Sequence, residues 1–193
     1  MTIKNLYPTQ RPALDLNFAN SERLDPRVSL TRASTATYVG SDGLIKTAAA
    51  GEARFDHDPI TGESSGLLVE ESRGNSVSRS SDFQTNWTNT NVLVVPNSST
   101  APDGTLTATS IVDDTTNGEH KVSRSAYVTV PKTRCTLTVF AKPNGLTTFE
   151  LGTISSSNLA RFTLVGEGTA TPVSGSTTPA GGGEVFIEKF ANG

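Results

Sequence analysis

The fold is decided by the stretch ATYVGSDGLIK, residues 36–46. Its two ends, Ala36–Val39 and Leu44–Lys46, hold the aliphatic, aromatic and β-branched side chains that are enriched in strands. Between them, Gly40–Gly43 ends in Asp-Gly, which supplies the positive φ that a tight hairpin turn requires. The stretch therefore predicts two antiparallel strands joined by a turn.

A second hairpin is predicted directly after the first. Strand-like residues 54–56 and 66–70 surround a turn at Asp58–Gly62. In that turn the Asp side chain accepts local backbone hydrogen bonds, Pro59 presets φ, and the glycine closes the loop. Residues 32–79 are therefore expected to form a small β-hairpin module.

Beyond this module, the hydrophobic pattern keeps a period of two, which is typical of strands. Short apolar runs occur at 126–130, 135–139, 149–151, 160–164 and 185–187. The chain also contains 28 Thr and 21 Ser, a composition that favours strands and turns over helices. We expect an all-β protein in which residues 80–193 form an antiparallel β-sandwich. Asn192-Gly193 is typical of a hairpin turn with no strand after it, so the natural chain is expected to continue and the sandwich to be truncated here.

The first 31 residues are predicted to be an extended attachment arm. Prolines disfavour helix in it. They are Pro8, Pro12 and Pro26. Leu14, Leu16 and Phe18 alternate with polar residues, so they are expected to form a strand that pairs with the sheet edge of a partner chain.

Composition and charge exclude several classes of protein. Sixteen basic and nineteen acidic residues give a net charge of −3, so a generally basic surface for nucleic acid is not indicated. No apolar run approaches the ~20 residues that cross a bilayer. The single Cys excludes an internal disulfide framework and fits synthesis in a reducing cytosol. We expect neither nucleic acid nor membrane as a partner.

Four segments carry a family resemblance. They are Leu24–Val28, Leu30–Tyr38, Ala53–Gly62 and Gly66–Asn75. Together they resemble the head of many bacteriophage tail-fibre and virion structural proteins. The resemblance implies a virion component made in the bacterial cytoplasm, with a β-sandwich, partners among other tail or head proteins, and often a trimeric fibre. It implies no catalysis.

The second part of the chain resembles phage domains that are similar to carbohydrate-binding jelly rolls. The segments concerned are Thr100–Thr105 and Thr138–Lys142. Trp87, together with Phe83, stands where such proteins commonly have a Trp and a Phe near the start of the next domain. Trp87, Tyr127 and Tyr38 are candidate platforms for a host glycan, although Trp87 also suits core packing, because a Trp buries ~150–250 Å². Two alternatives to a tail fibre therefore stay open: a carbohydrate-binding receptor-recognition module and a capsid decoration or head fibre protein.

The sequence gives only weak indications of a catalytic or metal site. Asp56-His57-Asp58 offers metal-ligand types, but turn chemistry explains Asp58, and neighbouring strand residues point to opposite faces. The same alternation separates Glu70 from Glu71, which argues against a glycosidase acid–base pair there. His120 lies in a polar turn and is expected to be solvated. We predict no enzyme activity, no cofactor and no metal.

Overall fold

A computed structural model describes residues 14–72, 74–77, 79–124, 136–152, 159–173 and 185–190. In those residues the protein is nearly all β, with every sheet antiparallel, which confirms the predicted fold class. The chain divides into two compact units after Glu71. Several expectations fall outside the described residues. They are the strand at 126–130, Cys135, the glycan candidate Tyr127, and the turn at Asn192-Gly193.

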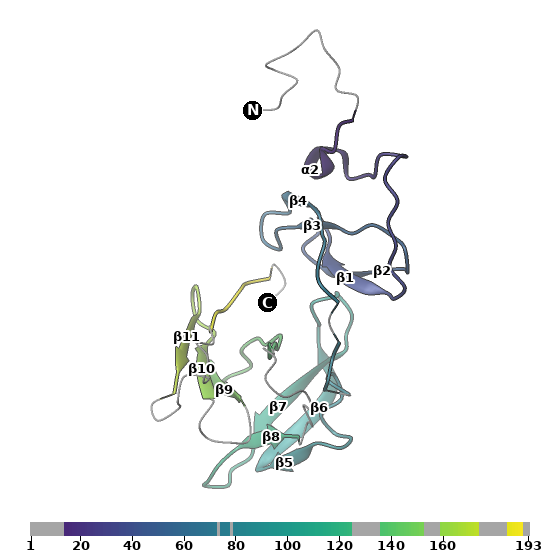
Figure 1. Cartoon of the computed structure of the whole chain (residues 1–193). Helices are drawn as coiled ribbons and strands as arrows, with labels where there is room; N and C mark the ends of the chain where they lie inside the picture. The colour runs from purple at the N-terminus through teal and green to yellow at the C-terminus, as the bar shows by residue number, and fades with distance from the viewer. Residues whose placement is uncertain are drawn as a thin grey trace. The chain divides into compact units, whose positions relative to one another are not determined.

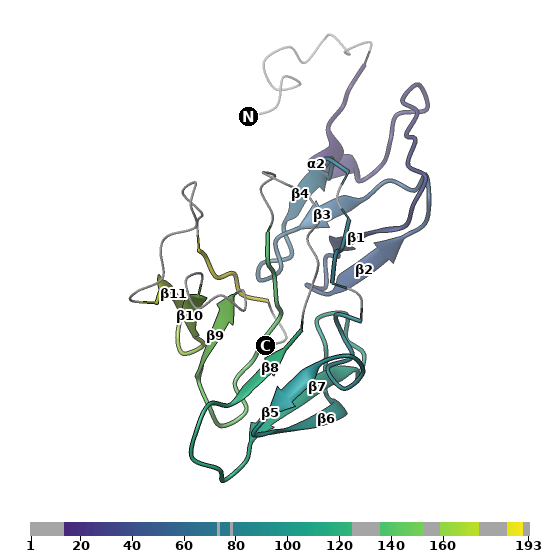
Figure 2. The same ribbon diagram turned by 60° about the horizontal axis from the view of Figure 1, so that its bottom comes forward.

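The first unit is built from two hairpins and a short helix (Figures 1 and 2). Its elements are α2 (Phe18–Ser21), β1 (Ala36–Val39), β2 (Ile45–Ala48), β3 (Phe55–His57) and β4 (Ser64–Leu67). β1 pairs with β2 and β3 pairs with β4, so both predicted hairpins are confirmed. β1 also lies against β3, and α2 lies against β4.

The expected strand through Leu14, Leu16 and Phe18 is wrong. Phe18 begins α2, in which the amide of Ser21 donates to the carbonyl of Asn17 at 3.0 Å. The Phe18 ring packs on Phe55 of β3 with 6.5 Å between centroids. The aromatic side chain of Phe18 thus finds its apolar contact within its own unit, and pairing of the arm with a partner's sheet edge stays a prediction. The described part of the arm therefore belongs to the same unit as the hairpins.

The second unit contains seven described strands in three sheets. They are β5 (Thr88–Thr90), β6 (Val92–Ser99), β7 (Ala108–Asp113), β8 (Lys121–Ser123), β9 (Thr148–Gly152), β10 (Leu159–Thr163) and β11 (Thr169–Pro172). β5 pairs with β8, β6 with β7, and β10 lies between β9 and β11. A jelly-roll arrangement of these sheets stays a prediction.

Two expected strands of this unit are confirmed and two are wrong. β9 and β10 match the predicted runs at 149–151 and 160–164, and their Phe149 and Phe162 rings stack at 5.2 Å between centroids. The described residues at 136–139 and 185–190 form no strand. There, Phe140 and Phe190 meet edge to face at 5.3 Å, so a side-chain contact brings these segments together without a backbone ladder.

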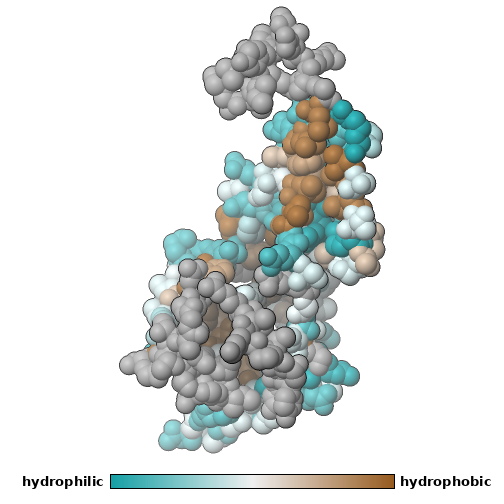
Figure 3. Space-filling model, viewed as in Figure 1, coloured by the Kyte–Doolittle hydropathy of each residue, from teal (hydrophilic) through white to brown (hydrophobic). Residues whose placement is uncertain are grey.

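Few apolar side chains of the described residues are fully enclosed. Ala48 of β2 and Val94 of β6 are the buried apolar ones, at 1% and 8% exposure. The first unit also buries two polar side chains, Arg54 and His57. Figure 3 shows a band of apolar surface on the visible face of the first unit. No helix in the described ranges has the length and apolar character to cross a bilayer.

Candidate functional site

Side chains at β3 supply hydrogen bonds to the backbone of β1. Arg54 Nη1 donates to the carbonyl of Thr37 at 2.8 Å. Asp56 Oδ1 accepts from the amide of Val39 at 2.7 Å, and His57 Nδ1 lies 3.1 Å from the carbonyl of the same residue. Backbone groups of a strand must be paired when they leave water. These three polar residues therefore join the two hairpins in place of a continuous ladder.

The pairing of β3 with β4 is irregular beside Asp56 and His57, the two adjacent residues that reach Val39. The pairing of β3 with β4 shifts register between these two residues. Asp56 pairs with Gly66 and His57 with Ser64, so the extra residue of this β-bulge is Ser65 of β4. Both side chains lie within hydrogen-bond distance of Val39, and the opposite facing of Asp56 and His57 stays a prediction.

A metal site at Asp56-His57-Asp58 finds no support in this geometry. Asp56 and His57 are engaged with Val39. Asp58 caps its own turn, accepting from the amides of Ile60 and Thr61 at 2.8 and 2.7 Å. Those amides, of Thr61 first, lower the pKa of the Asp58 carboxyl below its usual value. Within the described ranges, no group of three His, Cys, Asp or Glu side chains is arranged to hold a metal.

Glu70, at which the sequence argues against an acid–base role, forms an ion pair. Arg54 Nη1 lies 2.6 Å from Glu70 Oε2, with the arginine side chain 7% exposed and the glutamate 55% exposed. A charge-assisted bond of this kind fixes the direction of the buried guanidinium. Glu70 is therefore part of the tie between the hairpins.

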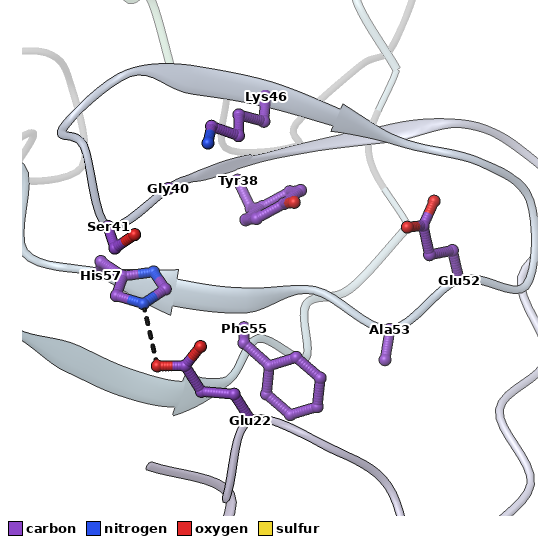
Figure 4. Close-up of a pocket in the computed structure, with 9 residues that line it drawn as sticks. All are labelled: Glu22, Tyr38, Gly40, Ser41, Lys46, Glu52, Ala53, Phe55 and His57. Atoms are coloured by element: carbon purple, nitrogen blue, oxygen red, sulfur yellow. Dashed lines mark hydrogen bonds and ion pairs between the residues drawn. The ribbon is translucent and has the colours of Figure 1, made fainter. Parts of the chain in front are cut away.

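The same unit contains an open cavity of about 410 Å³. Tyr38 and Lys46 line it as a directly opposed cross-strand pair of β1 and β2. Phe55 and His57 line it from β3, and Figure 4 shows their rings and that of Tyr38 around a common space. Glu22, which follows α2, and Glu52, which precedes β3, supply carboxylates to the lining.

The charged groups of the cavity have defined partners and can still form further hydrogen bonds. Glu22 Oε1 lies 3.3 Å from His57 Nε2, a contact drawn in Figure 4. Lys46 Nζ lies 3.0 Å from Asp42 Oδ2. A carboxylate has about four acceptor positions and an ammonium three donor hydrogens, so one bond leaves others open to a ligand. The cavity therefore offers donors, acceptors and aromatic rings together.

The arm residues differ in their surroundings. Leu14 and Leu16 are exposed at 45% and 47%, whereas Phe18 is half-buried against Phe55. Two of the three predicted partner-binding side chains thus present apolar surface to solvent. The third is engaged inside the unit.

Trp87 is held by three neighbours of the second unit. Its ring lies 5.0 Å from that of Phe83, and Arg124 Cζ lies 5.9 Å from its centroid. Its indole N–H donates to the carbonyl of Arg79 at 3.2 Å. Aromatic and cation–π contacts of this kind use the faces on which a sugar would stack. The geometry favours the packing interpretation of Trp87 over a glycan platform.

His120 is better connected than a solvated loop histidine. Its Nδ1 lies 2.7 Å from the carbonyl of Asn91. That hydrogen bond, assisted by the charges of Asp113 and Asp114, raises the pKa of His120 above its usual value. The local sequence gives no sign of this contact, because Asn91 lies 29 residues away.

Comparison with protein-family models, with curated proteins and with solved structures finds no match to this chain.

Proposed function

We propose that this chain is a structural component of a bacteriophage virion, carried on a tail fibre or another tail appendage. The observation that carries the proposal is the family resemblance of residues 24–75, four segments that resemble the head of phage tail-fibre and virion proteins. Arg54, Asp56, His57 and Glu70 belong to those segments and are the residues that tie the two hairpins together. Segments whose residues hold the two hairpins together suit a unit that attaches the chain to the particle.

In this role the first unit attaches the chain and the second unit is presented outward. Leu14 and Leu16 are the described arm positions that offer apolar surface to a neighbouring virion protein. A trimer is the expected assembly. The second unit serves assembly or contact with the host surface.

Purified particles test the proposal. Particles of the phage that encodes the chain are banded by density, measured by quantitative mass spectrometry, and labelled with gold-conjugated antibody against the second unit for electron microscopy. We expect peptides of the chain in the particle band and gold on tail appendages. Gold on the head would transfer the chain to the head-fibre alternative. Peptides in the lysate with none in the particles would refute a structural role.

A Leu14→Asp, Leu16→Asp double variant tests attachment through the arm. We expect particles that lack the chain, because charge at both positions prevents burial against a partner. The matched control places the same charge at Ile60, a side chain of the same unit that is 55% exposed and lies in the turn between β3 and β4. If the double variant is incorporated as well as the control, Leu14 and Leu16 do not take part in attachment.

A further inference from the structure

We propose that the cavity of the first unit binds a neutral saccharide, taking one pyranose ring between Tyr38, Phe55 and Glu22. The inference goes beyond the proposed function, because a sugar can bind this cavity wherever the chain is carried. It also places the sugar site in the first unit, apart from the aromatic candidates of the second.

The size and lining of the cavity suit a small ligand. Its volume of about 410 Å³ lies in the ~300–1,000 Å³ range of ligand pockets. Such pockets combine apolar and aromatic walls with a few polar groups that fix orientation. Here Tyr38 and Phe55 supply the aromatic part, and the polar part comes from five further side chains, Glu22, Ser41, Lys46, Glu52 and His57.

The register of the strands fixes the positions of the lining residues. Tyr38 and Lys46 are opposite each other in the β1–β2 pair, and Phe55 and His57 belong to the neighbouring strand β3. His57 is 6% exposed, and its two ring nitrogens lie 3.1 Å from the Val39 carbonyl and 3.3 Å from a Glu22 carboxylate oxygen. A wall that is held before binding loses little conformational freedom when a ligand arrives.

The mixture of charges selects a neutral ligand with hydroxyl groups. An anion would face the carboxylates of Glu22 and Glu52, and a cation would face the ammonium of Lys46. A sugar hydroxyl both donates and accepts, so it can donate to a carboxylate and accept from an ammonium in the same site. The apolar C–H face of a pyranose matches an aromatic ring in the same way as other flat apolar surfaces.

Glu22 is the residue that links the arm to this site. It ends α2 in a left-handed conformation, with φ of 46°, and its carboxylate reaches His57. Its side chain is 50% exposed, so the carboxylate also meets solvent at the cavity. The segment that follows the arm's helix therefore completes the polar rim.

Saturation-transfer NMR of the full chain with defined sugars tests the proposal. The probes are methyl glucoside, methyl galactoside, methyl mannoside and N-acetylglucosamine, with N-acetylneuraminic acid and glucosamine as the anionic and cationic comparisons. We expect at least one neutral sugar to bind with a dissociation constant of about 1 mM, the strength usual for so small a ligand. The charged probes should bind more weakly. Absence of saturation transfer to every neutral probe, or stronger binding of a charged probe, would overturn the proposal.

Variants locate the site. Tyr38→Ser removes the ring and should weaken binding about tenfold, which corresponds to the upper range of an aromatic contact. Glu22→Gln should weaken it by a smaller factor, whereas the matched control Glu63→Gln, a carboxylate of the same unit outside the cavity, should leave it unchanged.

Amide spectra report whether each variant keeps its fold, and Tyr38→Val, which also removes the ring but is favoured in strands, replaces Tyr38→Ser if that variant unfolds the unit. Unchanged sugar affinity in both Glu22→Gln and the folded Tyr38 variant would contradict a site in this cavity. Loss of binding in Trp87→Phe would contradict it as well, because that residue belongs to the second unit.

Discussion

The two units of this protein use polar and apolar side chains in different ways. In the first unit, Arg54 and His57 are buried and bond to the backbone of β1. In the second, Leu93 and Val112 are opposite each other on β6 and β7, and they are 61% and 41% exposed. A small unit encloses too little apolar surface to depend on a core alone. Buried polar ties can hold such a unit in one arrangement, provided that every partner is present.

The largest expected effect comes from the tie between hairpins. Arg54→Ala removes a buried side chain together with its bonds to Thr37 and Glu70, so the first unit should lose about 3 kcal/mol of opening free energy. Hydrogen exchange of the amides in β1 to β4 measures this. The matched control is Arg161→Ala in the second unit, whose 2.6 Å pair with Glu150 is exposed and should be worth less than about 0.5 kcal/mol. Equal losses for both variants would show that the buried Arg54 contacts stabilise the first unit no more than an exposed ion pair stabilises the second.

Glycine substitution gives the next largest effect. Gly62 has φ of 70°, and a Cβ there would lie 2.7 Å from the carbonyl oxygen of Ser41. Gly62→Ala should therefore cost about 2 kcal/mol, from conformation and from the clash. Gly166 of the second unit has φ of 63°, and a Cβ there would have no neighbouring atom within 4 Å, so Gly166→Ala should show the conformational cost alone. Equal losses in denaturation of the two variants would show that the turn at Ser41 yields freely to the added methyl group.

A smaller effect is expected at Asp56. Asp56→Ala leaves the amide of Val39 without its acceptor and should cost about 1.5 kcal/mol. Asp56→Asn retains an acceptor oxygen and should recover most of that loss. The exchange rate of the Val39 amide reports the bond directly. The prediction fails if this amide exchanges equally slowly in Asp56→Ala and in the unchanged protein.

The second unit should tolerate change on its exposed apolar face. Leu93→Thr replaces an exposed apolar residue with one that is favoured in strands, so the change in unfolding free energy should stay below about 0.5 kcal/mol. Trp87 fluorescence during urea denaturation follows this unit. A loss above about 1 kcal/mol lies beyond the range usual for surface substitutions. It would show that this face is covered in solution, and the second unit would no longer differ from the first by its exposed apolar residues.

The smallest expected effect is a pH dependence at His120. The carbonyl of Asn91 raises the pKa of this histidine in the folded state, so its stabilising contribution is complete below pH 6.5 and is lost as the pH rises through the folded value. An NMR titration of the ring protons should give a midpoint above 6.5. His120→Gln should remove the pH dependence of the amides around Asn91. A midpoint at or below 6.5 would contradict the contact.

Local sequence patterns predict the hairpins well and the arm poorly. The turns at Gly40–Gly43 and Asp58–Gly62 depend on residues close together in the chain, so they can be predicted from the local sequence alone. The alternation that ends at Phe18 is also local, but its outcome depends on Phe55, which lies far along the chain. The cavity could not be predicted from the sequence either. The sequence singles out Tyr38 as an aromatic candidate, but the other lining residues come from separate segments of the chain.

The β-rich class and the two hairpins of the first unit follow from the order of the amino acids alone, because period-two patterning and turn residues act over a few positions. The roles of Arg54, Asp56 and His57 are settled on folding. Two neighbouring side chains of β3 reach one residue of β1, and such a long-range hydrogen bond has no signature in a single strand's pattern. The same packing gathers Tyr38 and Glu22 around one space, because strands and a helix end from distant parts of the chain must meet before that cavity exists.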